Sequence, residues 1–181
     1  ICRAEYRSRV SALQRHCPRG RVLDVGCSTG ILAGLFHEAG YDVTACDISE
    51  EACRIARMTL GDRVLNGSLE SLAPQLMERP FDAVTLMDVL EHLPDPIASL
   101  RLIRTILKPG GILFLRTPSL RSPFFWAANW SYRLSLGRYT KAVRLIFHAE
   151  HLYFFTPASL KACLEDSGFT VLETRPDPSL W

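Results

Sequence analysis

The stretch that decides the fold is Arg21-Val-Leu-Asp-Val-Gly-Cys-Ser-Thr-Gly30, a short apolar run that ends in a glycine-rich loop. Such a run predicts a buried strand over 21–25, and the apolar spacing that follows predicts a helix over about 30–39. Gly26 and Gly30 leave out side chains where a ligand can approach the backbone, and the helix points free N–H groups at the same place. A ligand site and a tight turn with no ligand are both compatible with this loop.

Strands and helices alternate along most of the chain. We predict further strands over 42–46, near 63–65, over 81–86, over 112–115 and over 169–173. We predict further helices over 3–16, from Glu50 to about Met58, over about 96–107 and over about 157–167. Lys108-Pro-Gly-Gly111 is expected to stop the third of these helices, and Gly168 the fourth.

Nearly continuous apolar strands separated by helices are typical of a parallel sheet that is covered on both faces. The sequence therefore predicts the α/β class, as a Rossmann-like three-layer αβα sandwich with a mostly parallel sheet. A last strand often found in such sheets is expected to be missing, because few residues follow 173. With 181 residues, the chain is long enough for one hydrophobic core and too short for two ordinary domains.

Composition restricts the class of protein further. A formal net charge of +2 is too small to attract a polyanion without local clustering of basic residues. The six cysteines contain no C-x-x-C pair, which suits reduced thiols in a cytoplasmic protein better than a disulfide framework. No apolar stretch approaches the roughly 20 residues that a membrane span needs.

A carboxylate follows the second predicted strand, at Asp47. It can accept hydrogen bonds from both ribose hydroxyls of an adenosine, so the glycine loop and Asp47 together favour adenosine cofactors as a group. A dinucleotide fold uses G-x-G-x-x-G, whereas Ser28 occupies the middle position here and the glycines fall as G-x-x-x-G. This spacing weakens the hypothesis of an NAD-linked oxidoreductase, which ranks third.

Several motifs, taken in order, carry a family resemblance. Val22-Leu-Asp-Val-Gly-Cys-Ser-Thr-Gly30, Asp47, Asp88-Val-Leu-Glu-His-Leu-Pro-Asp-Pro96 and Leu107-Lys-Pro-Gly-Gly-Ile-Leu-Phe-Leu115 resemble the class I S-adenosylmethionine-dependent methyltransferases. Within them the chain is most similar to the ubiquinone-biosynthesis O-methyltransferases. The resemblance implies S-adenosyl-L-methionine as cofactor and S-adenosyl-L-homocysteine as product. It also implies O-methylation of a small hydrophobic (quinone-precursor-like), lipid-linked or glycan acceptor.

The resemblance also assigns donor-binding roles to residues. Asp24 and the backbone of Gly26, Cys27, Ser28 and Gly30 would hold the methionine moiety. We expect the loop to close although Ser28 replaces a common glycine, because serine is small.

Other positions would hold the adenosine and the reacting sulfur. Asp47 would bind the ribose, and Ile48 would cover one face of the adenine. Ser68 stands where the family usually has an acid, so its side-chain contact with the adenine edge is in doubt, while the backbone of Leu69 could still make one. Met87 and Asp88 would face the reacting sulfonium, although Asp88 is also a preferred helix N-cap residue.

Methyl transfer is an in-line displacement that depends mainly on positioning, and a base helps when the nucleophile is a hydroxyl. Histidine titrates near neutral pH and suits that role. The candidate bases are His151, His92 and His148, with Glu91 and Glu150 as partners. His151 is the first choice, since the second half of the chain should return over the cofactor. Packing or capping is the alternative role for each, and no residues have a spacing that predicts a metal site.

Residues 119–150 are basic and aromatic, with Arg121, Arg133, Arg138, Lys141 and Arg144 among tryptophans, tyrosines and phenylalanines. We expect a lid over the acceptor, with peripheral contact to anionic lipid through 119–147. A helical cap packed on the sheet is the alternative, and base stacking on single-stranded RNA ranks third, so nucleic acid is not an expected partner.

The chain is accordingly divided into an N-terminal helix (1–19), a cofactor-binding core (20–118), the insertion (119–150) and a C-terminal helix and strand (151–181).

A methyltransferase-like binding module that has lost catalysis is the alternative function, and Ser28 and Ser68 are the departures that favour it.

Overall fold

The computed structural model describes residues 3–120, 123–135 and 151–176. A five-stranded sheet lies at its centre, in the order β3-β2-β1-β4-β5, and every neighbouring pair of strands is parallel. The strands are β1 (Arg21–Val25), β2 (Asp42–Asp47), β3 (Val64–Asn66), β4 (Phe81–Met87) and β5 (Leu107–Arg116). The predicted α/β class with a parallel sheet is confirmed.

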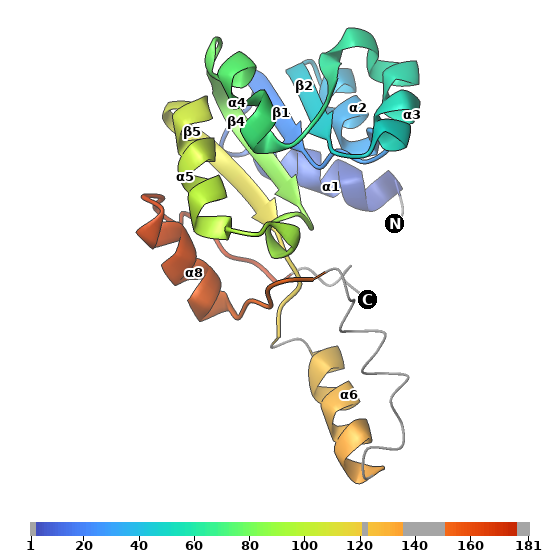
Figure 1. The fold of residues 1–181 in the computed structure, drawn as a ribbon, viewed down its shortest axis with the longest axis vertical. Coiled ribbons are helices and arrows are strands. Elements are labelled where there is room, and N and C mark those ends of the chain that lie inside the picture. The colour runs from blue at the N-terminus through green and yellow to red at the C-terminus, as the bar shows by residue number, and fades with distance from the viewer. Residues whose placement is uncertain (1–2, 121–122, 136–150, 177–181) are drawn as a thin grey trace.

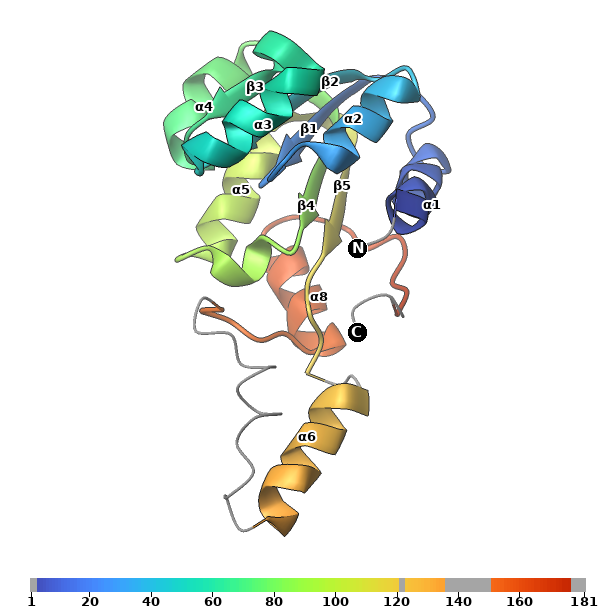
Figure 2. The same ribbon diagram turned by 90° about the vertical axis from the view of Figure 1, so that its right-hand side faces the viewer.

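Helices cover both faces of this sheet (Figures 1 and 2). The described helices are α1 (Arg3–Gln14), α2 (Ile31–Glu38), α3 (Glu50–Leu60), α4 (Leu69–Met77), α5 (Pro96–Ile106), α6 (Pro123–Leu134) and α8 (Pro157–Asp166), with short 3-10 helices at η1 (Gly61–Arg63) and η2 (Leu90–His92). Neighbouring residues of a strand point to opposite faces. Val22 therefore packs in the cluster formed with α1, α2 and α3, while Leu23 packs in the one formed with α4 and α5.

Helix α4 is absent from the predicted elements. Pro74 lies inside it, and proline ordinarily interrupts a helix because it lacks an N–H donor. The spacing of Leu69, Ala73 and Leu76 is the signal that would have predicted this helix, because the structure buries all three on one side.

Strand β5 begins earlier than predicted. Helix α5 ends at Ile106, so Lys108–Gly111 does not provide its stop. Phe81 pairs with Leu107 but Ala83 pairs with Ile112, and the extra residues form an irregularity within β5. The turn-forming residues therefore interrupt the strand pairing instead of separating a helix from a strand.

The predicted strand over 169–173 is wrong, because these residues belong to neither a helix nor a strand. A strand exists only by pairing, and none of the described strands pairs with them. Phe169 and Val171 instead pack against the apolar clusters around α5 and α8. Glu173 lies 3.1 Å from His16 and 3.7 Å from Arg15, just beyond the end of α1.

The basic and aromatic insertion is described in part. Its helix α6 lies beyond the end of β5 and away from the sheet in both views (Figures 1 and 2). Residues 121–122 and 136–150, which include the candidate His148 and its possible partner Glu150, lie outside the described residues. Among the described helices, none is both long enough and apolar enough to cross a membrane.

The strand order reverses direction between β1 and β4, because the chain moves outward from β1 through β2 and β3 and then returns to the other side of β1. The loops that leave the carboxyl ends of β1 and β4 therefore diverge, and a crevice opens between them. Ligands of open α/β sheets bind at such a switch point. The glycine loop and Asp88 both lie there.

Candidate functional site

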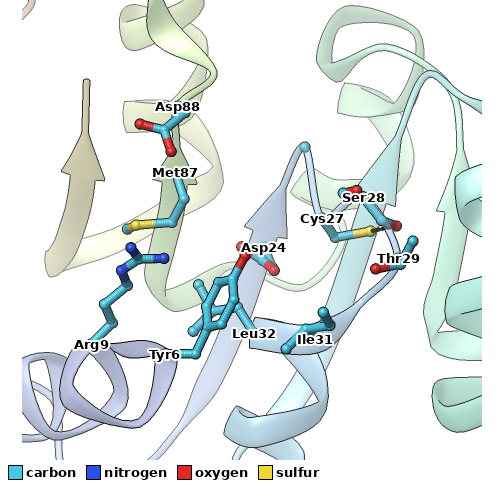
Figure 3. A pocket seen from close by; sticks show the side chains of 11 residues that line it. Tyr6, Arg9, Asp24, Cys27, Ser28, Thr29, Ile31, Leu32, Met87 and Asp88 are labelled. Atoms are coloured by element: carbon cyan, nitrogen blue, oxygen red, sulfur yellow. Dashed lines mark hydrogen bonds between the residues drawn. The ribbon is translucent and has the colours of Figure 1, made fainter. Parts of the chain in front are cut away.

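A pocket opens at this switch point, between the ends of β1 and β4 (Figure 3). The glycine loop and the start of α2 form one side of it, and Met87 and Asp88 at the end of β4 form the other. Asp24 lies at its base. Two residues of α1 complete the wall, namely Tyr6 and Arg9.

The glycine loop depends on residues in the left-handed backbone region. Gly26 has a φ of 69°, and a Cβ there would lie 2.4 Å from Val89 Cγ2. Gly30 has a φ of 78°, and its Cβ would lie 2.8 Å from Ala56 Cβ on α3. Ser28 also has a positive φ, of 50°, which explains why glycine suits this position. The loop closes around Ser28 at a modest conformational cost of about 1 kcal/mol.

Asp47 is joined directly to this loop. Its Oδ2 accepts a hydrogen bond from the Ser28 N–H at 2.8 Å, and its Oδ1 accepts one from the Ser49 N–H at 2.9 Å. The N–H groups of Gly26 and Cys27 donate to the Cys46 carbonyl at 2.8 and 3.0 Å. Because each carboxylate oxygen can accept two hydrogen bonds, Asp47 keeps capacity for two ribose hydroxyls.

The end of β3 lies beside Asp47, where Asn66 Nδ2 donates to the carbonyls of Asp47 and Ile48 at 3.0 and 3.2 Å. Ile48 is 79% exposed, so its apolar surface is open to solvent. Ser68 is the N-cap of α4, because its hydroxyl accepts a hydrogen bond from the Ser71 N–H. Ile48, Ser68 and Leu69 lie outside the lining of the pocket itself.

Asp24 is a buried acid, with 2% of its surface exposed. It points to the same face of β1 as Val22, where α1 and α2 cover it. Thr85 Oγ1 donates to Asp24 Oδ1 at 2.6 Å. Burial raises the pKa of Asp24 from 3.8 to about 7, because removing the carboxylate from water disfavours its charged form and the hydrogen bond from Thr85 offsets only part of this.

Cys27 also lines the pocket and is a buried free thiol. Its Sγ lies 3.6 Å from the Ser28 carbonyl oxygen. Burial raises the pKa of this thiol, and the nearby Asp24 and Asp47 carboxylates raise it further. The side chain is therefore a small apolar part of the wall at neutral pH.

Asp88 has a φ of 57° and does not cap η2, whose N-cap is Val89. Its carboxylate instead forms a two-pronged ion pair with Arg116 at the end of β5, with Arg116 Nε 3.0 Å from Asp88 Oδ1 and Nη2 bonded to Oδ2. The Asp88 N–H donates to the Arg116 carbonyl at 2.9 Å. One of the two prior interpretations of Asp88, helix capping, is therefore wrong.

Glu91, His92 and His151 gather beyond Asp88. The rings of His92 and His151 lie 4.7 Å apart edge to face. Glu91 is 1% exposed, its Oε2 accepts from Thr117 at 2.9 Å, and its Oε1 is buried with no hydrogen-bond partner. Burial raises the pKa of the Glu91 carboxyl. The three groups place a ligand atom each within 4.8 Å of the others, so they could share a proton or hold a metal ion.

The segment that carries His151 returns across the ends of β4 and β5. The N–H groups of Leu152 and Tyr153 donate to the Glu91 carbonyl at 2.9 and 3.1 Å, and Phe155 forms a bridge with Ser119. This cluster does not line the pocket. His16 and His37 are exposed.

Tyr6 and Arg9 are site residues that the sequence analysis does not single out. Arg9 is 6% exposed, and its guanidinium lies 4.7 Å from the centre of the Tyr6 ring. In Figure 3 it reaches from α1 toward Met87. Arg9 lies next to Val10, on the face of the helix that Val10 and Leu13 bury. An arginine on a buried face is the signal that could have identified it, because arginine side chains are mostly exposed in proteins.

A parallel sheet of this order with a glycine loop and an acid at the end of the next strand is the arrangement of Rossmann-like folds that bind adenosine cofactors. The chain belongs to the methyltransferase domain family, whose model matches residues 3–174. The cofactor that this assignment gives to the chain is S-adenosyl-L-methionine. Asp47 is bonded to the glycine loop at the end of β2 and, like Ile48, does not line the pocket, which lies on the β4 side of the loop.

Known relatives and structures agree with this assignment. A ubiquinone biosynthesis O-methyltransferase from Xanthomonas campestris is 39% identical over 153 residues, which cover 81% of this chain and 61% of that protein. This chain thus spans about three fifths of the length of that relative. A methyltransferase from Archaeoglobus fulgidus has the same fold, with a TM-score of 0.70, 21% identity, and coverage of 93% of this chain and 70% of that one. One from Thermotoga maritima matches with a TM-score of 0.67, 25% identity, and coverage of 92% and 71%.

The raised pKa of Asp24 predicts a pH-dependent stability. Between 3.8 and about 7 the folded chain binds more protons at this site than the unfolded chain, so the free energy of unfolding falls as pH rises through that window. Asp24→Asn removes this contribution. The free energy of unfolding of the variant, relative to that of wild type, should increase by about 2–3 kcal/mol from about pH 5 to about pH 8, measured by urea unfolding. Asp62→Asn, at an exposed acid in η1, is the control, and a constant difference between Asp24→Asn and wild type would contradict the prediction.

Proposed function

We propose that the chain forms the donor-binding part of an S-adenosylmethionine-dependent O-methyltransferase that acts on a small hydrophobic, quinone-precursor-like, lipid-linked or glycan acceptor. The observation that carries the proposal is the hydrogen bond between Ser28 and Asp47, which brings the glycine loop and the ribose-binding acid together beside an open pocket.

The donor fits the charges around the pocket. Asp47 would accept the two ribose hydroxyls, and Ile48 would cover the adenine. The methionine end carries a carboxylate and an ammonium group, and Arg9 and Asp24 are the buried groups of opposite charge on that side of the pocket. A guanidinium can bind a carboxylate through two parallel hydrogen bonds, which suits Arg9 to this role.

Asp47→Ala tests the donor site. Its loss removes two charge-assisted hydrogen bonds to the ribose, each contributing about 1.5–3 kcal/mol, so S-adenosylmethionine should bind at least about 100-fold more weakly in calorimetry. Asp62→Ala is the matched control because it removes an exposed acid away from the pocket. Unchanged affinity in a folded Asp47→Ala variant would refute the assignment. Donor binding with no methyl transfer to any acceptor would instead favour the catalytically inactive binding module.

The transfer step follows from the chemistry of a sulfonium. A lone pair on the acceptor oxygen forms the new bond to the methyl carbon, and the carbon–sulfur bond breaks with its electrons remaining on sulfur. The acceptor hydroxyl loses its proton, and we assign the base to His151, with His92 beside it and Glu91 as the carboxyl partner. Their clustering at the ends of β4 and β5 supports this role.

His151→Gln should lower kcat at least about 100-fold while the dissociation constant of S-adenosylmethionine stays the same, since a general base contributes at this scale only during transfer. The assay follows labelled methyl transfer to 4-hexylcatechol, a small hydrophobic probe with acidic hydroxyls. His37→Gln is the control on the exposed face of α2. EDTA should leave the wild-type rate unchanged, because we assign proton transfer and no metal ion to this cluster. A rate within threefold of wild type in His151→Gln would exclude it as the base.

A hydrophobic acceptor partitions into lipid, so an enzyme reaches it most readily at a membrane surface. On α6, Trp126, Trp130 and Leu134 follow helical spacing on one side and are 67%, 43% and 78% exposed, with Arg133 beside them. The two tryptophan rings lie 5.7 Å apart. Aromatic rings next to a cation suit the headgroup region of an anionic bilayer, so we assign peripheral membrane contact to this face.

Vesicle sedimentation tests the membrane assignment. Trp126→Ala combined with Trp130→Ala should weaken binding to vesicles of equal phosphatidylglycerol and phosphatidylcholine by at least about tenfold, because two interfacial anchors are lost. Ile55→Ala combined with Met58→Ala removes two exposed apolar side chains from α3 and should change nothing. Equal binding by both double variants would rule out α6 as the contact.

A further inference from the structure

A mostly buried cation pairs with an acid in one wall of the pocket. Arg116 is the last residue of β5, and its side chain is 11% exposed, while that of Asp88 is 32% exposed. The ion pair uses both carboxylate oxygens of Asp88 and two nitrogens of Arg116. A hydrogen bond between their backbones fixes the same two residues from the other side. The pair is therefore held in one geometry.

This pair controls the charge that the pocket presents next to Met87. Asp88 lines the pocket itself, and Arg116 lies outside the lining. The positive φ of Asp88 turns its side chain away from the regular strand direction of β4. Arg116 compensates the carboxylate at close range, so this wall is nearly neutral although it contains an acid.

The charge matters because methyl transfer changes the charge of the cofactor. S-adenosylmethionine carries a positive sulfur, and S-adenosylhomocysteine carries a neutral one. An uncompensated carboxylate beside the sulfur would stabilise the donor and not the product. Stabilisation of the ground state alone slows a reaction, because the transition state, in which the positive charge is already spreading, gains less from it.

We propose that Arg116 is a positioning residue that cancels the charge of Asp88, so that the pocket does not favour the charged donor over the neutral product. The inference rests on the proposed binding of S-adenosylmethionine at this pocket. It goes beyond that function because it assigns a task to a side chain that does not touch the cofactor.

Binding of the two cofactor forms tests it without any acceptor. Calorimetry gives the dissociation constants of S-adenosylmethionine and S-adenosylhomocysteine for wild type, Arg116→Met, Arg116→Lys, Asp88→Asn and the double variant Arg116→Met with Asp88→Asn. Arg116→Met should raise the preference for the donor over the product about tenfold, the size expected for one uncompensated charge several ångströms away in a partly screened site. Asp88→Asn removes the carboxylate from the pocket lining while the Arg116 guanidinium stays, and should lower the same preference by a similar factor.

The controls separate charge from structure. Arg116→Lys keeps the cation, and the double variant removes both charges, so each should return to within about threefold of the wild-type ratio. A purely structural role would weaken both cofactors alike and leave the ratio unchanged in every variant, which would overturn the inference. If Arg116→Met does not fold, the ratio in Asp88→Asn decides alone. If wild type binds neither cofactor, the proposed function fails and this inference falls with it, whereas binding with an unmoved ratio refutes this inference only.

Discussion

The hydrogen bonds that tie the glycine loop to the end of β2 are the constraint on which the rest of the site depends. Ser28 donates to the Asp47 side chain, and Gly26 and Cys27 donate to the Cys46 carbonyl. They fix the loop and the acid in one orientation, while Ser49 holds the second oxygen of the same carboxylate. A nucleoside therefore meets a preformed surface and does not have to organise one, which lowers the entropic cost of binding.

The other side of the pocket treats each buried charge differently. Asp24 is partly neutralised by the low polarity of its surroundings and receives a hydrogen bond from Thr85. Asp88 stays paired with a guanidinium. Arg9 packs over the Tyr6 ring, and its position on α1 brings the start of the chain to the cofactor site.

Much of this arrangement could be predicted from the sequence, because it follows from local patterns. The strands predicted over 21–25 and 42–46, the glycine loop after the first and the carboxylate at 47 are set by apolar runs and turn residues that lie close together in the chain. Helix α4, which contains Pro74, was not predicted, and the strand that was predicted over 169–173 does not form. Both errors have a different cause. Local propensity was overruled there, by packing of Leu76 in the first case and by the lack of a pairing partner in the second.

The ion pair between Asp88 and Arg116 was out of reach. It joins residues far apart in sequence, and spacing carries no information on which distant side chain compensates a charge. The sequence offered His92 and His151 as candidate bases but did not predict that their rings meet, since this requires the segment after α6 to return across β4 and β5.

The buried sulfur of Cys27 has a chemical consequence for a protein that holds a methyl donor. A thiolate is a far better nucleophile than a thiol, and one in the wall of this pocket would compete with the acceptor for the methyl group. Burial keeps Cys27 protonated, as it does Cys46, whose pKa it raises to about 12. The loop can thus carry sulfur beside an alkylating agent without becoming its own substrate.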